Sequence, residues 1–573
     1  MNSINLKWSI DYYEANTKEC DERLKSLNNF NEIPIVSSEN LDHFKDGDLV
    51  RYQGMVQDML NPEYYYSSYS LRDCNSGEVT ERSGKYRDIA PCKENEELNL
   101  DGKVPGERLV FYCIPLPGMS KWVQNALKKL SESKMSGNTM SNKKRPIEED
   151  PDEKMEVGDS MEGNHINKSK RVTEESRDAE GSQNESHSSE KYFPLNEKDG
   201  LPCIVKVYEK EDKCGIVLND RIEVIGFLSL NPALESTWED SDPEDKALHP
   251  PPSLVPRIHA IFTRKLVHSN PLLSQNIDSS DIIATAERVR SDLHLILTQI
   301  LYGDDLAADY VICHLLSRIY SRIEDQALGK FSLNLCNIQL GSYCRRLYGL
   351  LETLVTNSQY LPLSINSLNE KSFIPKKDYE TNRLWSGRLQ LCDDTHLIVD
   401  ETEMNEGKLE HTGCLNVSAL QNVIRDQEIH YDFSYYSVKY NTNVPVLVLS
   451  EGKSMFETDI RIKLKPDLSM TDTINETFDA AAFFLNEEMS QRIRNYLTCM
   501  RLQEFEISEE LMRKIGDDYV SMRQQKNGVN SSDLHNLLVL SRLLALSYGR
   551  TSLTANDWSR ALEMETERKS RFA

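Results

Sequence analysis

The sequence lacks the cysteine patterns of zinc-binding and disulfide-rich proteins. Its twelve cysteines are scattered singly, with no C-x-x-C motif and no cluster of cysteine with histidine. This spacing excludes an obvious zinc site, and it favours reduced thiols in an intracellular protein. Long apolar runs are missing too: none reaches about 18 residues, and the N-terminal M-N-S-I-N-L-K-W-S-I-D has no apolar signal core. We therefore expect a soluble nuclear or cytosolic protein with no membrane partner.

Basic residues are also in short supply. The chain carries 67 Lys and Arg against 92 Asp and Glu, which gives a net charge of −25. Because phosphate binding needs clustered cations, this balance argues against a dedicated nucleic-acid or anionic-membrane surface. We expect no direct nucleic-acid binding, although a local basic patch is compatible with such an average. At 573 residues the chain is long enough for two to four domains.

One long stretch lacks large apolar residues altogether. Residues 131–191 contain no Leu, Phe, Trp or Tyr and are dense in Ser, Glu, Asp, Lys and Asn. Such a segment cannot bury enough apolar surface to offset chain entropy, so it is predicted to be a disordered insert. Two short basic clusters within it are candidate nuclear import signals: Lys143, Lys144 and Arg145, and Lys168, Lys170 and Arg171. The alternative is an ordinary charge fluctuation in a charged tether.

The insert interrupts a series of predicted strands. After an N-terminal helical segment, 1–44, alternating or β-rich stretches occur at 48–59, 63–71, 108–115, 203–208 and 221–230. Five strands without a strong helix among the first three predict a small OB-like barrel, with parts at 45–130 and 192–235. Tyr64, Tyr65 and Tyr66 could stack single-stranded bases. The alternative is that alternate tyrosines pack inward.

The C-terminal half changes character. An acidic, proline-rich linker is predicted at 236–253, followed by an α/β domain at 254–500 and a helical lid at 501–573. Helices are expected from apolar spacing at 281–301, 306–319, 343–355, 417–424, 533–548 and 554–569, strands around 331–335, 397–401 and 444–449, and a hairpin at 428–440. Thr554 is the predicted N-cap of the last helix, with Asp557 three residues on.

One predicted strand ends in two acids. Leu397-Ile398-Val399 is followed by Asp400 and Glu401, as when a buried parallel strand delivers carboxylates to the carboxyl edge of a sheet. In an ATPase the first acid would hold Mg²⁺ and the second would orient a water. Any strand that runs into a polar turn can look similar.

The segment R-L-Q-L-C-D-D-T-H-L-I-V-D-E resembles the strand-acid region of the AAA+ module in minichromosome maintenance (MCM) helicase subunits. More closely, V-Q-D-M-L-N-P-E-Y-Y, G-K-Y-R-D, S-L-V-P-R-I-H, D-Y-E-T-N-R-L-W-S-G and D-L-H-N-L-L-V-L-S-R together resemble the MCM-binding protein family. The resemblance covers essentially the whole chain except the insert. It implies an OB-like barrel followed by a degenerate AAA+-like α/β domain.

Departures from a working ATPase indicate that the chemistry is lost. A P-loop needs glycines around the phosphates, a Lys, and a Ser or Thr for Mg²⁺. In the stretch that matches by position, Gly303-Asp304 opens the segment, Asp309 stands in the Lys position and Tyr310 in the Ser/Thr position. Ser450 follows the 444–449 strand where an MCM subunit would carry Asn, and Ser531-Ser532-Asp533 holds no Arg. We therefore expect a pseudo-ATPase with no cofactor, no metal and no catalytic residue.

The resemblance implies a non-enzymatic partner of MCM helicase subunits that acts in DNA replication and the cell cycle, in the nucleus, with indirect chromatin association. It would affect the assembly, stability or chromatin release of the MCM complex. Two rival functions remain at this point. One is an active AAA+ ATPase with an atypical phosphate site, and the other is a single-strand-binding OB protein.

Overall fold

The structure is a computed structural model that describes residues 8–26, 30, 32–89, 92, 95–135, 200–209, 214–231, 249–324, 326–338, 341–524 and 530–572. Most of the predicted insert (136–191), including both basic clusters, and most of the predicted linker (236–248) lie outside the described residues. The first five residues of the predicted insert end helix α3, which runs from Lys121 to Met135.

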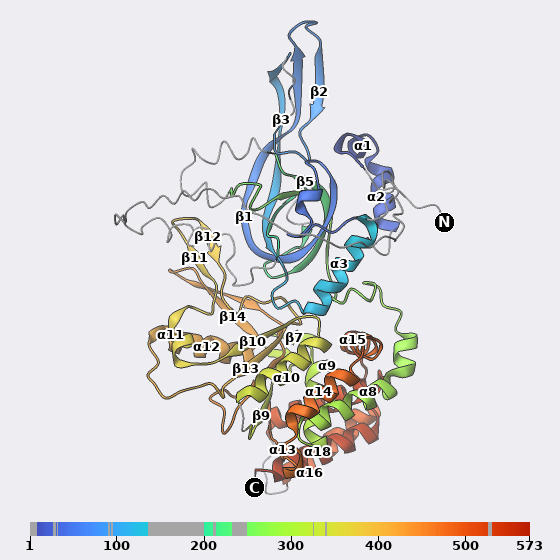
Figure 1. The fold of residues 1–573 in the computed structure, drawn as a ribbon, viewed down its shortest axis with the longest axis vertical. Helices are drawn as coiled ribbons and strands as arrows, with labels where there is room; N and C mark the ends of the chain where they lie inside the picture. Colours follow the sequence, from blue (N-terminus) through green and yellow to red (C-terminus); the bar gives the residue numbers. More distant parts are fainter. Residues whose placement is uncertain are drawn as a thin grey trace, which may run out of the picture.

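The N-terminal half forms a ring-like sheet (Figure 1). Its strands are β1 (Leu49–Asp73), β2 (Val79–Ser83), β3 (Glu96–Ile114), β4 (Cys203–Val207), β5 (Arg221–Ser229) and β6 (Arg257–Lys265). They pair in the order β2-β1-β3-β4-β6-β5, and an additional β1–β5 pairing closes the ring. Only the β4–β6 pairing is parallel among these described strands. The closed ring removes the unpaired edges that an open sheet of this size would expose.

Strand β1 is far longer than predicted. The stretches 48–59 and 63–71, predicted as two strands, form one continuous strand that pairs with β3 along most of its length. Register shifts between Leu60 and Glu63 and between Tyr66 and Ser70 accommodate the Asn61-Pro62 interruption and the tyrosines. Beyond the ring, β1, β2 and β3 continue as a projecting arm, at the top of Figure 1.

The last strand of the ring comes from a part of the chain that sequence reasoning assigned elsewhere. Strand β6 lies within 254–500, predicted as an α/β domain, yet it pairs with β4 and β5. Alternation explains its place: Ile258 and Ala260 join the buried ring interior, whereas His259 between them points to the opposite face.

Short helices flank the ring. They are α1 (Ile10–Ala15), α2 (Thr17–Ser26) and the 3₁₀ turn η1 (Leu41–His43). Tyr13 and Leu24 of α1 and α2 are buried with Phe227 of β5 in one apolar cluster. The described part of the predicted N-terminal helical segment, 1–44, thus contains two short α-helices and one 3₁₀ turn.

The C-terminal half contains a five-stranded parallel sheet. Its strands are β9 (Leu333–Cys336), β10 (Ser358–Pro362), β13 (His396–Asp400), β16 (Val446–Leu449) and β17 (Ile460–Lys463), in the order β10-β13-β16-β9-β17. Both faces are buried, and side chains alternate between them. Ile398 and Leu447 contribute to one apolar core, whereas Leu397 and Val446 contribute to another.

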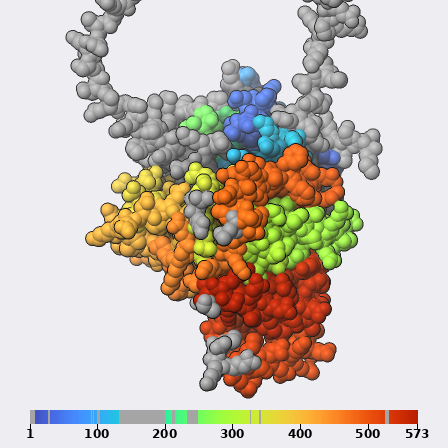
Figure 2. All heavy atoms as spheres, turned by 60° about the horizontal axis from the view of Figure 1, so that its bottom comes forward, coloured from blue at the N-terminus to red at the C-terminus, as the bar shows by residue number. Residues whose placement is uncertain are grey.

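Helices cover both faces of the parallel sheet. On one side are α11 (Ile365–Glu370) and α12 (His411–Arg425), which share the second core with β13 and β16. The others are α8 (Ser280–Ile300), α9 (Asp305–Leu316), α10 (Gly341–Leu354), α13 (Leu468–Thr471), α14 (Ile474–Phe484), α15 (Glu487–Leu502), α16 (Glu509–Gln524), α17 (Ser531–Ser547) and α18 (Ala555–Ser570). In Figure 2 the residues nearest the C-terminus, in red, lie below the green and yellow ones.

Capping explains where the last helices begin. Asn530 and Asp533 form a capping box at α17, and Thr554 and Asp557 form the predicted one at α18. Helix α9 differs from the amphipathic helices because nearly every residue in it is buried, which places it in the middle of the helical layer.

A small four-stranded sheet lies between the two halves. It consists of β11 (Lys376–Asp378), β12 (Arg383–Trp385), β14 (Glu428–Asp432) and β15 (Ser437–Asn441), in the order β12-β11-β14-β15, and a separate two-stranded sheet pairs β7 (Ser321–Ile323) with β8 (Gln326–Leu328). Asp58 of the ring accepts a hydrogen bond from the Leu384 backbone N–H at 2.9 Å, and the Gln57 amide donates to the Leu384 carbonyl at 2.7 Å. These buried contacts fix the ring on the C-terminal half. The ring-like sheet, the parallel sheet and the helices confirm a mixed α/β fold.

Candidate functional site

The predicted acids Asp400 and Glu401 lie at the carboxyl edge of the parallel sheet. Asp400 ends β13 and is paired in register with Leu449 of β16, so that Ser450 follows at the same edge. The sequence prediction of a strand that ends in acids is confirmed. This edge is where α/β proteins place ligands.

Asp400 is fully buried and occupied by the protein itself. Its carboxylate accepts hydrogen bonds from the hydroxyl of Tyr360 on β10, from the Thr402 backbone N–H at 2.8 Å and from the Thr402 hydroxyl at 2.7 Å. Three internal donors therefore satisfy an acid that would otherwise be free to hold a cation.

Glu401 is less well compensated. It accepts hydrogen bonds from the Ser454 hydroxyl at 3.0 Å and the Met455 backbone N–H at 3.2 Å. Burial, together with the neighbouring Asp400, raises the pKa of Glu401 to about 6, and the two hydrogen bonds only partly oppose this effect. A carboxyl with such a pKa could exchange a proton near neutral pH. A metal site at this edge is not indicated, because no group of three or more metal-ligating side chains occurs among the described residues.

Ser450 completes this edge without leaving a free donor. Its hydroxyl accepts from the Asn334 amide of β9 at 2.9 Å and donates to the Gly452 carbonyl at 3.1 Å. The interactions of Asp400, Glu401 and Ser450 thus run inward to neighbouring strands and loops.

The segment predicted to match the P-loop lies elsewhere in the topology. Gly303 and Asp304 connect helix α8 to helix α9, whereas a P-loop connects a strand to a helix. Gly303 adopts φ +81°, and Asp304 caps α9 by accepting from the Ala307 backbone N–H at 3.0 Å. The turn that resembled a phosphate loop is a helix–helix connection.

The anion position at the start of α9 is filled by the chain's own carboxylate. Asp304 accepts from Arg571 near the C-terminus at 2.6 and 3.0 Å, and from the Lys465 backbone N–H at 2.9 Å. A phosphate at this helix start would have to displace an acid that is nearly inaccessible to solvent.

Asp309 and Tyr310 are structural residues of the helical layer. Asp309 pairs with Arg290 of α8 at 2.5 Å and with His294 at 3.3 Å. Burial opposes its charge, but these partners hold the pKa of Asp309 below its usual range. Tyr310 is fully buried, and its hydroxyl donates to Glu565 of α18 at 3.4 Å. The partners of both residues lie on helices α8 and α18, not at the carboxyl edge of β13.

One connection that joins a strand of the parallel sheet to a helix lies between β9 and α10. It ends in Gly341-Ser342-Tyr343 at the start of α10. Tyr343 is buried, and its hydroxyl donates to the Ile300 carbonyl at 2.9 Å. Sequence reasoning missed this connection because its single Gly, with neither a Lys nor a Ser/Thr after Ser342, carries no P-loop signature. The strand near 331–335 and the helix 343–355 were the only available signal.

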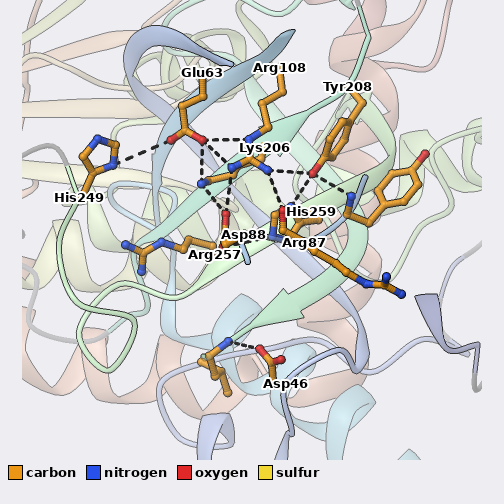
Figure 3. Close-up of polar contacts among 12 residues, drawn as sticks. Asp46, Glu63, Arg87, Asp88, Arg108, Lys206, Tyr208, His249, Arg257 and His259 are labelled. Carbon is orange, nitrogen blue, oxygen red and sulfur yellow. Dashed lines mark hydrogen bonds and ion pairs between the residues drawn. The ribbon is translucent and has the colours of Figure 1, made fainter. Parts of the chain in front are cut away.

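A second polar constellation lies on the outer face of the ring (Figure 3). Lys206 sits between the interior residues Val205 and Val207, so its side chain points outward from β4. There it contacts Glu63 of β1 at 2.9 Å and Asp88 at 2.7 Å. We call Glu63, Asp88, Arg108, Lys206, Tyr208 and His259 the ring cluster.

Within the ring cluster, His259 links Tyr208 to Asp88 by hydrogen bonds. The Tyr208 hydroxyl lies 2.7 Å from Nδ1 of His259, and Nε2 of His259 lies 3.2 Å from Asp88. Burial lowers the pKa of His259, so its imidazole is neutral. The imidazole accepts a hydrogen bond from Tyr208 and donates one to Asp88. Although burial also disfavours a charged Asp88, its contacts with His259, Lys206 and Arg108 hold the pKa of Asp88 well below its usual range.

The six residues of the ring cluster include two cations and two carboxylates, and the buried Arg257 is a third cation near both acids. Arg108 contacts Glu63 at 2.7 Å and Asp88 at 3.0 Å, so two cations meet two carboxylates. Sequence reasoning missed the cluster because its members are spread from residue 63 to residue 259 and no local pattern joins them. The ring cluster has a structural role, because its contacts hold the loop that carries Asp88 against β3, β4 and β6.

The three tyrosines beside the ring cluster alternate. Tyr64 and Tyr66 are exposed, whereas Tyr65 packs edge-on against Tyr208 at 5.2 Å. Together with Tyr69, Arg87 and Arg108 they line a cavity of about 480 Å³. The alternation matches the packing alternative more closely than a continuous stacking platform, and the cation nearest to Tyr65, Arg108, already pairs with two acids.

The chain matches the family described as mini-chromosome maintenance replisome factor over residues 20–572. It belongs to this family. Among its relatives, a mini-chromosome maintenance complex-binding protein of Drosophila melanogaster is 37% identical over 98% of this chain and 95% of the relative. Proteins of the same name from Gallus gallus and Homo sapiens are each 35% identical over the whole chain and 95% of the relative. The resemblance to the MCM-binding protein family is thereby confirmed.

Within the described residues, no helix is long and apolar enough to cross a membrane. All strands of the ring and of the parallel sheet fall inside the matched range, so family membership covers both sheets.

Proposed function

We propose that this protein binds MCM helicase subunits and acts in DNA replication as a non-enzymatic regulator of the assembly, stability or chromatin release of the MCM complex. One observation carries the proposal: the family match spans residues 20–572, and the relatives that cover nearly the whole chain are named as MCM complex-binding proteins. Contact with chromatin is then indirect, through the MCM complex.

The proposal includes a domain interpretation. The ring without β2, which pairs with β1 only in the arm, has five strands closed by the β1–β5 pairing and is interpreted as an OB-like barrel. The parallel sheet with its acids at the edge of β13 is interpreted as a degenerate AAA+-like domain, and α16 to α18 as its helical lid. The β4–β6 pairing supports a boundary after Lys265 rather than at residue 253.

The absence of ATP chemistry is supported by what fills the candidate phosphate positions. Asp304 occupies the start of α9 together with Arg571, and the buried Tyr343 occupies the start of α10. Neither position offers the Lys and the Ser or Thr that a P-loop uses for phosphates and Mg²⁺. Asp400 already accepts three hydrogen bonds, from Tyr360 and Thr402.

The proposed partner is tested by mixing purified full-length chain with purified MCM subunits after nuclease treatment. We expect co-elution on size exclusion that survives moderate salt, because a protein contact of about 1,600 Å² or more is less salt-sensitive than a nucleic-acid contact. A chain without residues 136–191 should bind equally well, as should Asp400→Asn. Binding that disappears with nuclease, or that resides in residues 136–191 alone, would refute the proposal.

Nuclear localisation is proposed to rest on the two basic clusters. Replacement of Lys143, Lys144, Arg145, Lys168, Lys170 and Arg171 by Ala should move a fluorescent fusion to the cytoplasm, because import receptors recognise such clusters. Replacement of Lys121, Lys128 and Lys129 of α3 is the matched control, which should leave the fusion nuclear. Unchanged nuclear accumulation of the first variant in cells depleted of MCM subunits would reject this role.

A further inference from the structure

A small cavity lies where the ring meets the C-terminal half. Its volume is about 30 Å³, and its polar lining consists chiefly of Arg221, Arg318, Asp394, His396 and Arg501. Arg221 comes from β5 of the ring, His396 from the start of β13 and Arg501 from α15. Three separate parts of the fold therefore send charged or polar side chains to one point.

Positive charge is in excess at this cavity. Asp394 accepts from Arg221 at 2.9 Å and from Arg501 at 3.0 Å, and the Nε of Arg318 lies 3.9 Å away. Three guanidinium groups thus surround one carboxylate. The neighbouring Asp393 is exposed and accepts from the Asn443 backbone N–H at 3.0 Å, so even when its charge is counted an excess of cation remains.

Several donors at the cavity have no hydrogen-bond acceptor. These are the Nε atoms of Arg318 and Arg501 and the Nδ1 atom of His396. His396 is 3% exposed, and its Nε2 accepts from Arg501 at 3.3 Å. Burial, reinforced by Arg501, lowers the pKa of His396 well below its usual range, so the neutral ring carries its proton on Nδ1. An unpaired buried donor of this kind is costly and calls for an acceptor.

We propose that this cavity binds one tetrahedral oxyanion of the phosphate class. Arginine is the side chain best suited to such an anion, because its planar donors match two oxygens at once. A single water needs about 10–15 Å³ of such space, so about 30 Å³ has room for a group larger than one water. The anion would neutralise the surplus charge and accept from the unpaired donors.

Occupancy would also join the two halves of the molecule. Arg221 reaches the cavity from the ring, and Arg318 and Arg501 reach it from the C-terminal half, so one anion would contact both. Bound oxyanion should therefore stabilise the ring against separation from the parallel sheet. The cavity is separate from the carboxyl edge of β13 and from the start of α9, and anion binding there does not depend on MCM binding.

Isothermal titration of the full-length protein with inorganic phosphate tests the proposal, at constant pH and with ionic strength held by sodium chloride. Saturable binding that raises the unfolding temperature is expected. Arg318→Gln should weaken it on the order of tenfold, by loss of one charge close to the anion. Arg318 has few native contacts to lose, and Arg513→Gln, an exposed arginine on α16, is the matched control that should change nothing.

A second variant gives the opposite sign. Asp394→Asn removes the carboxylate that competes for the same arginines, so it should tighten phosphate binding by about tenfold while lowering the unfolding temperature of the anion-free protein. If the role of Asp394 were purely structural, Asp394→Asn would lower the unfolding temperature without increasing the affinity for phosphate.

Parallel titrations with ATP in the absence of Mg²⁺ and with phosphoserine identify the source of the phosphate group. The tightest Arg318-dependent ligand is the one that the site takes. The proposal is overturned if none of the three binds saturably, or if Arg318→Gln and Arg513→Gln behave alike. Should Asp394→Asn fail to fold, the Arg318→Gln and Arg513→Gln pair still decides.

Discussion

The ring cluster and the edge of the parallel sheet both bury carboxylates, but they treat them in opposite ways. Asp88 lies 2.7 Å from Lys206 and 3.0 Å from Arg108, and its pKa is held well below the usual range despite burial. Glu401 is compensated by neutral donors, Ser454 and the Met455 backbone, and burial raises its pKa to about 6. The first acid is a fastened structural charge. The second is an acid without a cation.

The two acids thus differ in whether a cation of the protein lies beside them. In a nucleotide-binding site, Mg²⁺ and a P-loop Lys would supply the missing positive charge beside acids at a strand end. Here Asp400 turns to Tyr360 and Thr402 instead, and Glu401 is left at a pKa that no cation lowers. At this edge the acids accept hydrogen bonds from uncharged groups of the protein, among them Tyr360, Thr402 and Ser454.

The largest effect should come from the ring cluster. Asp88→Asn leaves Lys206 and Arg108 with one carboxylate between them, so it should cost about 3–5 kcal/mol of unfolding free energy, measured by urea denaturation. Glu97→Gln, an exposed acid on β3, is the matched control and should stay within about 0.5 kcal/mol.

A double-mutant cycle sharpens this result. Asp88→Asn combined with Lys206→Met leaves the Arg108–Glu63 pair balanced, so the double variant should lose less stability than the sum of the single variants. Simple additivity, or a cost of Asp88→Asn below about 1 kcal/mol, would show that the cluster is not a coupled unit.

The pH dependence of stability should differ between the two acids. The raised pKa of Glu401 means that the folded state binds its proton more tightly than the unfolded chain, whose pKa is about 4.5. The stability that this proton contributes is therefore present below pH 4.5 and is lost as pH rises through about 6, by about 1–2 kcal/mol. Glu401→Gln should abolish this loss, as read by urea denaturation at half-unit pH steps.

Asp88 has the opposite sign. Its pKa is depressed in the folded state, so its stabilising contribution is present above the unfolded value near 3.8 and is lost as pH falls below it. Asp88→Asn should flatten the profile only at acid pH. If both variants altered the same pH range, the contrast between the two regions would be wrong.

Local signals in the sequence were sufficient for individual elements. An apolar triplet before Asp400 predicted β13, and Thr554 with Asp557 predicted the start of α18, because both signals depend on a few adjacent residues. The hairpin near 428–440 and the helices around it were found for the same reason.

Features that depend on distant pairing were not predictable. Strand β6 follows a proline-rich stretch and looks like part of the next domain, but its partners are β4 and β5. Gly303 and Asp304 open a helix, as a P-loop does, yet the element before them is helix α8 rather than a strand. The ring cluster joins residues nearly 200 positions apart, such as Glu63 and His259, and no periodicity marks them.

Calorimetric titration of the free protein with ATP and Mg²⁺ tests whether the edge of the parallel sheet binds nucleotide. Because Asp400 already accepts hydrogen bonds from Tyr360 and Thr402 and the start of α9 is filled by Asp304 and Arg571, we predict no saturable Mg²⁺-dependent binding up to millimolar ATP. The chain should bind MCM subunits equally well without nucleotide. Micromolar, Mg²⁺-dependent binding of ATP that Asp400→Asn abolishes would contradict the account.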